Sequence, residues 1–170
     1  MKKNISTPTK KIVPVNKKAE SLHIVAIGAS AGGLEAITEL LHSITQKTGM
    51  VFIYIPHLSP DHKSLLTAIL SKATSMKVQE VTDKIMMKPD CFYIIPPDKE
   101  MTVLDGHIQL CARSKEKVVH LPINTFFTSL ADIHKQNSIG VVLSGSANDG
   151  TLGLVAIKAA GGITFAQNDT

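Results

Sequence analysis

Short apolar runs rich in β-branched residues alternate along this chain with segments whose apolar residues recur at helical spacing. The runs lie at 22–27, 50–55, 139–143 and 163–166. Helical spacing is found at 34–44, 60–72, 123–135 and 152–160. Strands that are apolar along their whole length are buried on both faces, and their alternation with helices is typical of a parallel sheet. The pattern predicts an α/β fold with a doubly wound, mostly parallel sheet and helices on both faces.

The pattern changes between residues 76 and 111, where three short β-like runs follow one another. They lie at 92–95, 101–104 and 107–111, and the last two are separated by Asp105-Gly106. An Asp-Gly pair between two such runs is a strong signal for a tight β-hairpin. We therefore expect a small antiparallel hairpin inserted into the parallel fold, and we assign all three runs to it.

The positive charge of the chain is concentrated at its beginning. The formal net charge is +4, but residues 1–18 contain six Lys and no acid, which leaves 12 basic and 14 acidic residues in the remainder. A Lys-, Pro- and Thr-rich segment cannot bury enough apolar surface to fold. We expect a disordered basic tail at 1–20 and one domain at 21–170, without a nucleic-acid-binding surface. Weak contact of the tail with an acidic partner or a membrane surface stays open.

No apolar run has the length of a signal-peptide core or a membrane span, so we expect a cytoplasmic protein without membrane insertion. The two cysteines, Cys91 and Cys111, belong to no zinc or disulfide motif and are expected to be reduced. The chain ends directly after the run at 163–166, where an α/β domain usually continues. We therefore expect the domain to be truncated at its C-terminus.

The segment Gly28-Ala29-Ser30-Ala31-Gly32 lies between a predicted strand and a predicted helix and satisfies the pattern G-x-S-x-G. In this context a serine can be held on a sharp turn with its hydroxyl exposed as a nucleophile. One alternative is that Ser30 is only the N-cap of the helix. Another is a dinucleotide-binding turn, but that motif needs glycine at position 30 and an acid after the second strand.

His57 and Asp149 each follow a different predicted strand, as Ser30 does. The carboxyl ends of parallel strands meet at one edge of a sheet, so the three side chains should emerge together. They would supply a nucleophile, a general base and an acid that orients the base. Taken singly, His57 could be an ordinary solvated histidine and Asp149 the N-cap of the next helix. Together they predict the catalytic triad Ser30, His57 and Asp149.

The chain resembles the catalytic domain of the chemotaxis protein-glutamate methylesterases (CheB), in particular the variant found in fusions with a methyltransferase. The similar segments are 24–33, 56–64, 93–98, 121–127 and 141–150. The resemblance implies that Ser30 is the nucleophile, His57 the general base and acid, and Asp149 the group that holds the imidazole. It also implicates the backbone amides of Ala31 and Ser146 as oxyanion donors, and it requires no cofactor or metal.

The resemblance further implies hydrolysis of glutamate γ-methyl esters on chemoreceptor helices, deamidation of receptor glutamines by the same chemistry, and association with a CheR-type methyltransferase. Three positions depart from the family pattern. Pro56 replaces a frequent Gln, Asn124 replaces a usual aspartate, and Ser146-Ala147 replaces a pair that normally ends in glycine. A non-catalytic signalling module with the same fold is therefore the alternative.

Overall fold

The computed structural model describes residues 22–30, 32–57, 65–104, 106–113, 120–143 and 148–168. The predicted basic tail at 1–20 lies outside these residues. The elements of the fold, in chain order, are β1 (Ile24–Ala29), α1 (Gly33–Ser43), β2 (Val51–Pro56), α2 (Leu66–Leu70), β3 (Lys77–Glu80), β4 (Ile85–Met86), β5 (Cys91–Ile94), β6 (Lys99–Leu104), β7 (His107–Ala112), α3 (Pro122–His134), the 3-10 turn η1 (Lys135–Asn137), β8 (Ser138–Val142), α4 (Thr151–Ala159) and β9 (Ile163–Ala166).

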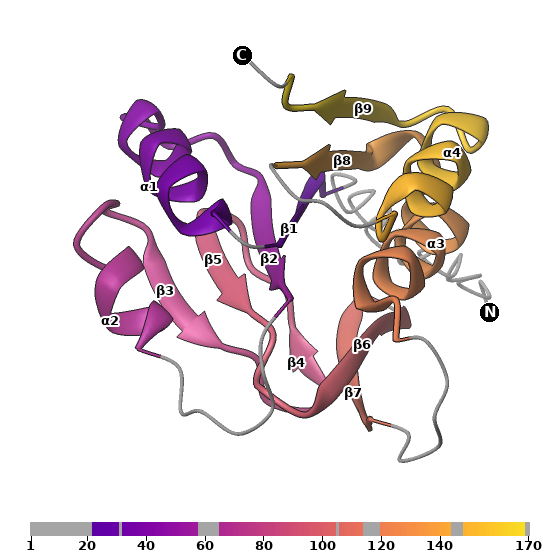
Figure 1. The fold of residues 1–170 in the computed structure, drawn as a ribbon, viewed down its shortest axis with the longest axis horizontal. Helices are drawn as coiled ribbons and strands as arrows, with labels where there is room; N and C mark the ends of the chain where they lie inside the picture. The colour runs from indigo at the N-terminus through magenta and orange to yellow at the C-terminus, as the bar shows by residue number, and fades with distance from the viewer. Residues whose placement is uncertain are drawn as a thin grey trace, which may run out of the picture.

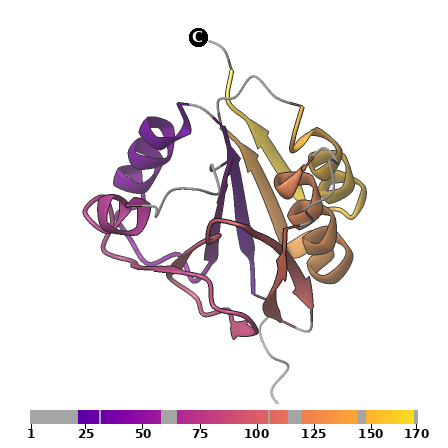
Figure 2. The same ribbon diagram turned by 60° about the horizontal axis from the view of Figure 1, so that its bottom comes forward.

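The main sheet has the strand order β3-β5-β2-β1-β8-β9 within the described part of the chain, and every neighbouring pair is parallel. Helices α1 and α2 lie on one side of this sheet, and α3 and α4 lie on the other (Figures 1 and 2). The predicted doubly wound parallel sheet is therefore confirmed. None of the described helices is long and apolar enough to span a membrane.

Strand β2 explains why the apolar runs are continuous. Val51, Ile53 and Ile55 belong to the core that contains α3 and α4, whereas Phe52 and Tyr54 belong to the core that contains α1 and α2. Successive side chains of a strand point to opposite faces, and here both faces are covered. Each position of β2 therefore needs an apolar residue, and its sequence does not alternate between apolar and polar residues.

The antiparallel insertion is a second sheet with the order β4-β7-β6. The predicted hairpin is confirmed, because β6 and β7 pair from Lys99 with Ala112 to Leu104 with His107. The sheet packs on α3, where the backbone N–H of Val103 donates to the Ser129 hydroxyl at 3.1 Å. The insertion thus extends the core on the α3 side of the main sheet.

Assignment of the run at 92–95 to the insertion was wrong. This run forms β5, which lies in the main sheet between β2 and β3 and is parallel to both. Phe92 and Tyr93 are both buried, in the two different cores. The sequence of a strand that is buried on both faces does not indicate which sheet the strand joins, because its hydrogen-bonded partners are distant in sequence. The short strands β3 and β4 were not predicted.

The close packing of α4 on α3 depends on Gly153. A Cβ atom added at this position would lie 2.4 Å from the Cβ of Phe127. We expect Gly153→Ala to lower the free energy of unfolding by about 2 kcal/mol, since overpacking costs more than the helix propensity that alanine gains. Urea denaturation measures this, with Lys158→Ala on the exposed face of α4 as the control. A variant as stable as the parent would contradict the predicted clash.

Candidate active site

Ser30 lies on a tight turn between the end of β1 and the start of α1. Its carbonyl accepts a hydrogen bond from the N–H of Gly33 at 3.0 Å, and Gly32 has a left-handed φ of 88°. A Cβ at Gly33 would lie 2.3 Å from the Cβ of Ala29, so only glycine fits there. The N-cap of α1 is Gly32, without a side-chain cap. The alternative that Ser30 is merely the helix N-cap was therefore wrong.

His57 reaches the same edge of the sheet through the continuing β1–β2 ladder. Its backbone N–H donates to the carbonyl of Ala29, the residue before Ser30, at 2.9 Å. On the other side of β1, the N–H of Leu143 donates to Gly28 at 2.9 Å. These bonds place the ends of β2, β1 and β8 side by side. The imidazole of His57 is exposed.

Asp149 is buried, with 5% of its surface exposed, and it caps a helix that is distant in sequence. One carboxylate oxygen accepts the N–H of Ile123 at 3.1 Å, and the other accepts the N–H of Asn124 at 2.9 Å. These donors lie in the first turn of α3, where backbone N–H groups have no partner within the helix and the helix dipole favours a negative charge. The expected alternative, a cap on the following helix α4, was wrong, because Gly150 is the N-cap there.

The side chain of Asn124, at the start of α3, caps the start of α4. Its side-chain oxygen accepts the N–H of Gly150 at 3.1 Å and the N–H of Gly153 at 2.8 Å. The two helix starts are therefore tied to each other, with the side chain of each segment bound to the backbone of the other. An amide oxygen accepts these bonds without placing a second carboxylate beside Asp149. The sequence showed that Asn124 departs from the family pattern but not what it binds.

A pocket joins the three predicted triad residues, although they come from distant parts of the chain. It is lined by Ala29, Ser30, His57, Ile123, Val142, Leu143 and Asp149. The side chain of Ile123 packs directly against Gly28, where an added Cβ would lie 2.5 Å from it. Ile123 therefore closes the pocket on the side of α3. Among the described residues, no hydrogen bond or ion pair joins the imidazole of His57 to the carboxylate of Asp149. Asp149 is thus held in place by α3, whereas the side chain of His57 is exposed and forms no hydrogen bond with it.

Pro56, the residue before His57, ends the pairing of β2 with β5. The carbonyl of Tyr54 accepts the N–H of Ile95 at 3.1 Å. The backbone N–H and C=O groups of the even-numbered residues of β2 therefore point toward β5, and those of the odd-numbered residues point toward β1. Pro56 is the next residue on the β5 side and has no N–H to donate. Pairing with β5 therefore stops at Tyr54, whereas pairing with β1 continues to Pro56. A second cavity begins where the two strands part, and it is also lined by His57.

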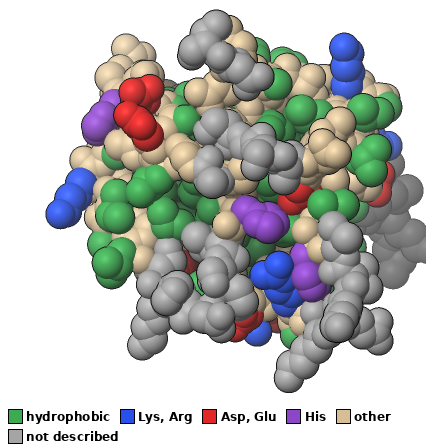
Figure 3. All heavy atoms as spheres, in the orientation of Figure 1, with side chains coloured by type: hydrophobic (Ala, Val, Ile, Leu, Met, Phe, Trp, Pro, Cys, Tyr) green, Lys and Arg blue, Asp and Glu red, His purple; other side chains and the backbone are tan. Residues whose placement is uncertain are grey.

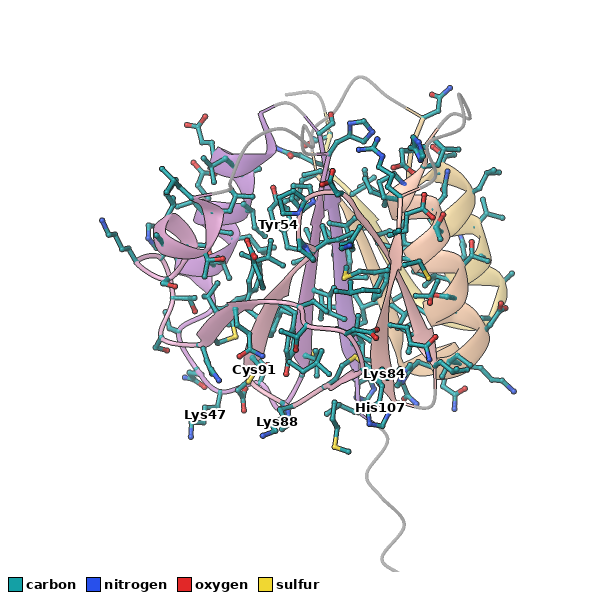
Figure 4. All side chains as sticks on the ribbon, turned by 90° about the horizontal axis from the view of Figure 1, so that it is seen from below. Lys47, Tyr54, Lys84, Lys88, Cys91 and His107 are labelled. Atoms are coloured by element: carbon teal, nitrogen blue, oxygen red, sulfur yellow. The ribbon has the colours of Figure 1, made fainter. Side chains whose placement is uncertain are left out.

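Tyr54 lies below the turn that carries Ser30. A Cβ at Gly33 would lie 3.4 Å from its hydroxyl, and burial raises the pKa of Tyr54 to about 12. The phenol is therefore uncharged at neutral pH. Figure 4 shows the labelled basic residues Lys47, Lys84, Lys88 and His107 at the opposite edge of the sheet, away from this site.

The predicted oxyanion donors, Ala31 and Ser146, lie outside the described residues, as does Ala147. Both cysteines are free. Within the described ranges, no group of three or more His, Cys, Asp and Glu side chains is arranged to hold a metal ion.

Comparison with known proteins gives consistent matches. The sequence profile of the family described as CheB methylesterase matches residues 25–170. A protein-glutamate methylesterase/protein-glutamine glutaminase of Salmonella typhi is 33% identical over 150 residues, which cover 86% of this chain and 43% of that protein. An uncharacterized 104.1 kDa protein of Rhodobacter capsulatus is 38% identical over 103 residues, which cover 61% of this chain and 11% of that protein.

Among solved structures, the CheB methylesterase catalytic domain of Thermotoga maritima superimposes with a TM-score of 0.78 at 26% sequence identity. The match covers 88% of this chain and 81% of that one. The chain spans less than half the length of the curated relatives named above.

Proposed function

This chain belongs to the CheB methylesterase family, and we propose that it is a serine esterase that hydrolyses glutamate γ-methyl esters on chemoreceptor helices. The observation that carries the proposal is the single pocket lined by Ser30, His57 and Asp149. A nucleophile, a base and an acid in one pocket are what acyl transfer requires. The Salmonella typhi relative is named for the same activity.

In the proposed reaction the hydroxyl oxygen of Ser30 attacks the ester carbonyl while His57 takes its proton. His57 then gives this proton to the departing methoxide, which leaves as methanol. Water attacks the acyl-enzyme with His57 again acting as the base, and the glutamate carboxylate is released from Ser30. With a glutamine substrate the leaving group is ammonia, so the same steps deamidate it.

Asp149 would orient His57 and stabilise its positive charge during the reaction. Each of its oxygens accepts one backbone N–H from α3 and keeps lone-pair capacity for a further donor. Because the side chain of His57 is exposed, it can rotate toward this carboxylate when substrate fills the pocket. Catalytic hydrogen bonds are often absent from unliganded sites and form only in the complex.

The oxyanion of the tetrahedral intermediate would be bound by the backbone amides of Ala31 and Ser146. Support comes from the resemblance and from the direction of α1, whose amino-terminal end follows Ser30. Each such donor contributes about 3–4 kcal/mol to stabilisation of the transition state. Association with a CheR-type methyltransferase is part of the same proposal.

A second candidate is a non-catalytic module that binds receptor or methyltransferase. The missing contact between His57 and Asp149 favours it, within the part of the chain that the structure describes. The two functions differ in whether any acyl-enzyme forms.

The decisive experiment measures methanol release from methylated receptor membranes by this chain, together with labelling of its serines by a fluorophosphonate. We expect methanol release above the protein-free rate and a covalent adduct on Ser30, located by peptide mass spectrometry. If a folded chain releases no methanol and Ser30 stays unlabelled, the binding module replaces the esterase.

A further inference from the structure

The second cavity adjoins the candidate active site on the side of β5 and β6. It shares His57 with the triad pocket, and the proline rings of Pro56, Pro96 and Pro97 form part of its wall. A group bound here would therefore lie beside the proposed catalytic base, within reach of a substrate whose ester sits over Ser30.

A histidine and an acidic side chain in this cavity pair with each other. The ring Nδ1 of His120 lies 3.2 Å from the carboxylate of Glu100, and the two side chains are 19% and 30% exposed. This pair leaves Arg113, Lys99 and Asp98 as the other charged residues of the cavity.

Arg113 is half-buried, and within the described part of the chain no carboxylate pairs with it. Its backbone N–H donates to the carbonyl of Asp98 at 3.0 Å, but no acid among the described residues lies within ion-pair distance of its guanidinium. Arginine is rarely buried without a partner, because partial loss of water around the charge is costly. The planar fork of N–H donors matches a carboxylate in geometry. An unpaired arginine in a cavity therefore favours an acidic ligand.

Asp98 lines the same cavity and opposes that attraction. Its backbone is left-handed, with a φ of 60°, in the turn between β5 and β6. Its carboxylate repels an acidic ligand, whereas Lys99 on the neighbouring position attracts it. Figure 3 shows two histidine side chains and a Lys or Arg side chain close together near the centre of one face. Outside the pair of His120 and Glu100, the described lining of the cavity carries two cationic side chains, Lys99 and Arg113, against the one carboxylate of Asp98.

We propose that this cavity is a subsite for an acidic side chain of the protein substrate, which Arg113 binds while the neighbouring methyl ester lies over Ser30. The inference rests on the proposed esterase function and adds a substrate preference to it: esters next to a free carboxylate are processed faster. Arg113 is then a specificity-determining residue.

The test uses two synthetic helical peptides that carry one glutamate γ-methyl ester, with either Glu or Gln at the neighbouring positions. For the parent chain we expect kcat/KM to be about tenfold higher with the Glu peptide, since a charge-assisted bidentate contact contributes at least that much. Arg113→Gln should reduce this ratio to about 1, and Arg113→Glu should invert it. A ratio near 1 for the parent, or an unchanged ratio in Arg113→Gln, overturns the subsite.

Two further variants separate this site from the general charge of the protein. Asp98→Asn removes the opposing charge and should raise the ratio, whereas Lys72→Gln removes an exposed positive charge that does not line the cavity and should leave the ratio unchanged. A loss of the ratio in Lys72→Gln would mean that net charge, and not Arg113, sets the preference. If Arg113→Gln does not fold, Arg113→Lys keeps a charge without the fork and should retain only part of the ratio.

Binding measured without turnover distinguishes failure of the subsite from failure of the proposed function. Fluorescence anisotropy of both peptides is followed with Ser30→Ala and with Ser30→Ala combined with Arg113→Gln. Tighter binding of the Glu peptide that disappears in the double variant supports the subsite even if neither peptide is hydrolysed, in which case the esterase proposal fails alone. Equal Kd values for the two peptides overturn the subsite whatever the turnover.

Discussion

Replacing Ser30 by Ala is expected to lower methanol release by about 10,000-fold or more. The substitution removes the oxygen that would form the acyl-enzyme, and among the residues that the structure describes no other hydroxyl lines the triad pocket. The remaining rate would come from binding and from the oxyanion donors alone. Single-turnover release of methanol from methylated receptor membranes measures the effect.

Ser43→Ala is the matched control for this prediction. Ser43 lies at the exposed end of α1, and its hydroxyl donates to the carbonyl of Glu39. Its loss should leave methanol release within a factor of two of the parent, as expected for a surface change. If Ser30→Ala keeps more than a tenth of the parent rate, another nucleophile must act and the triad is wrong.

Replacing Asp149 by Ala is expected to lower both activity and stability. Methanol release should fall by about 1,000-fold or more, because His57 loses the acid that orients it. The free energy of unfolding should fall by about 3–5 kcal/mol, since the N–H groups of Ile123 and Asn124 lose charged acceptors and stay buried. Urea denaturation and methanol release, measured where both proteins are folded, separate the two effects.

Asp132→Ala provides the comparison for Asp149. Asp132 is an exposed acid on the same helix α3, and its removal should change stability by no more than about 0.5 kcal/mol. Asp149→Asn keeps one acceptor oxygen for the start of α3 and should therefore lose less stability than Asp149→Ala. Equal stability of the parent and Asp149→Ala would show that the carboxylate does not hold the two helix starts together.

The sequence predicted the parts of the fold that depend on local pattern. Helix α3 was expected at 123–135 and is found at Pro122–His134, and the strand expected at 163–166 is β9. The Asp-Gly hairpin was also correct. Periodicity, turn residues and the apolar content of doubly buried strands act over a few residues, so they can be read without knowledge of the partners. The positions of Ser30 and His57 at one sheet edge follow from the same rule, since parallel strands end together.

Interactions between distant segments were decided only by the tertiary structure. Asp149 was considered as a cap for the helix that follows it, but its carboxylate binds α3, and Asn124 binds α4 in return. The run at 92–95 joined the parallel sheet instead of the hairpin beside it in sequence. Arg113 is the one arginine of the sequence and belongs to no sequence motif, and the role proposed for it depends on a cavity built from several segments.

The division has one physical reason. Local sequence determines which backbone groups and side chains seek partners, because the chain geometry of a turn, a strand or a helix end depends on its own residues. Which partner each group finds depends on packing, since the core between the main sheet and α3 and α4 sets how these two helices lie against each other and against the sheet. The proposed nucleophile and base could therefore be predicted from the sequence, whereas the contacts of Asp149 and the shape of the neighbouring cavity were determined by the fold.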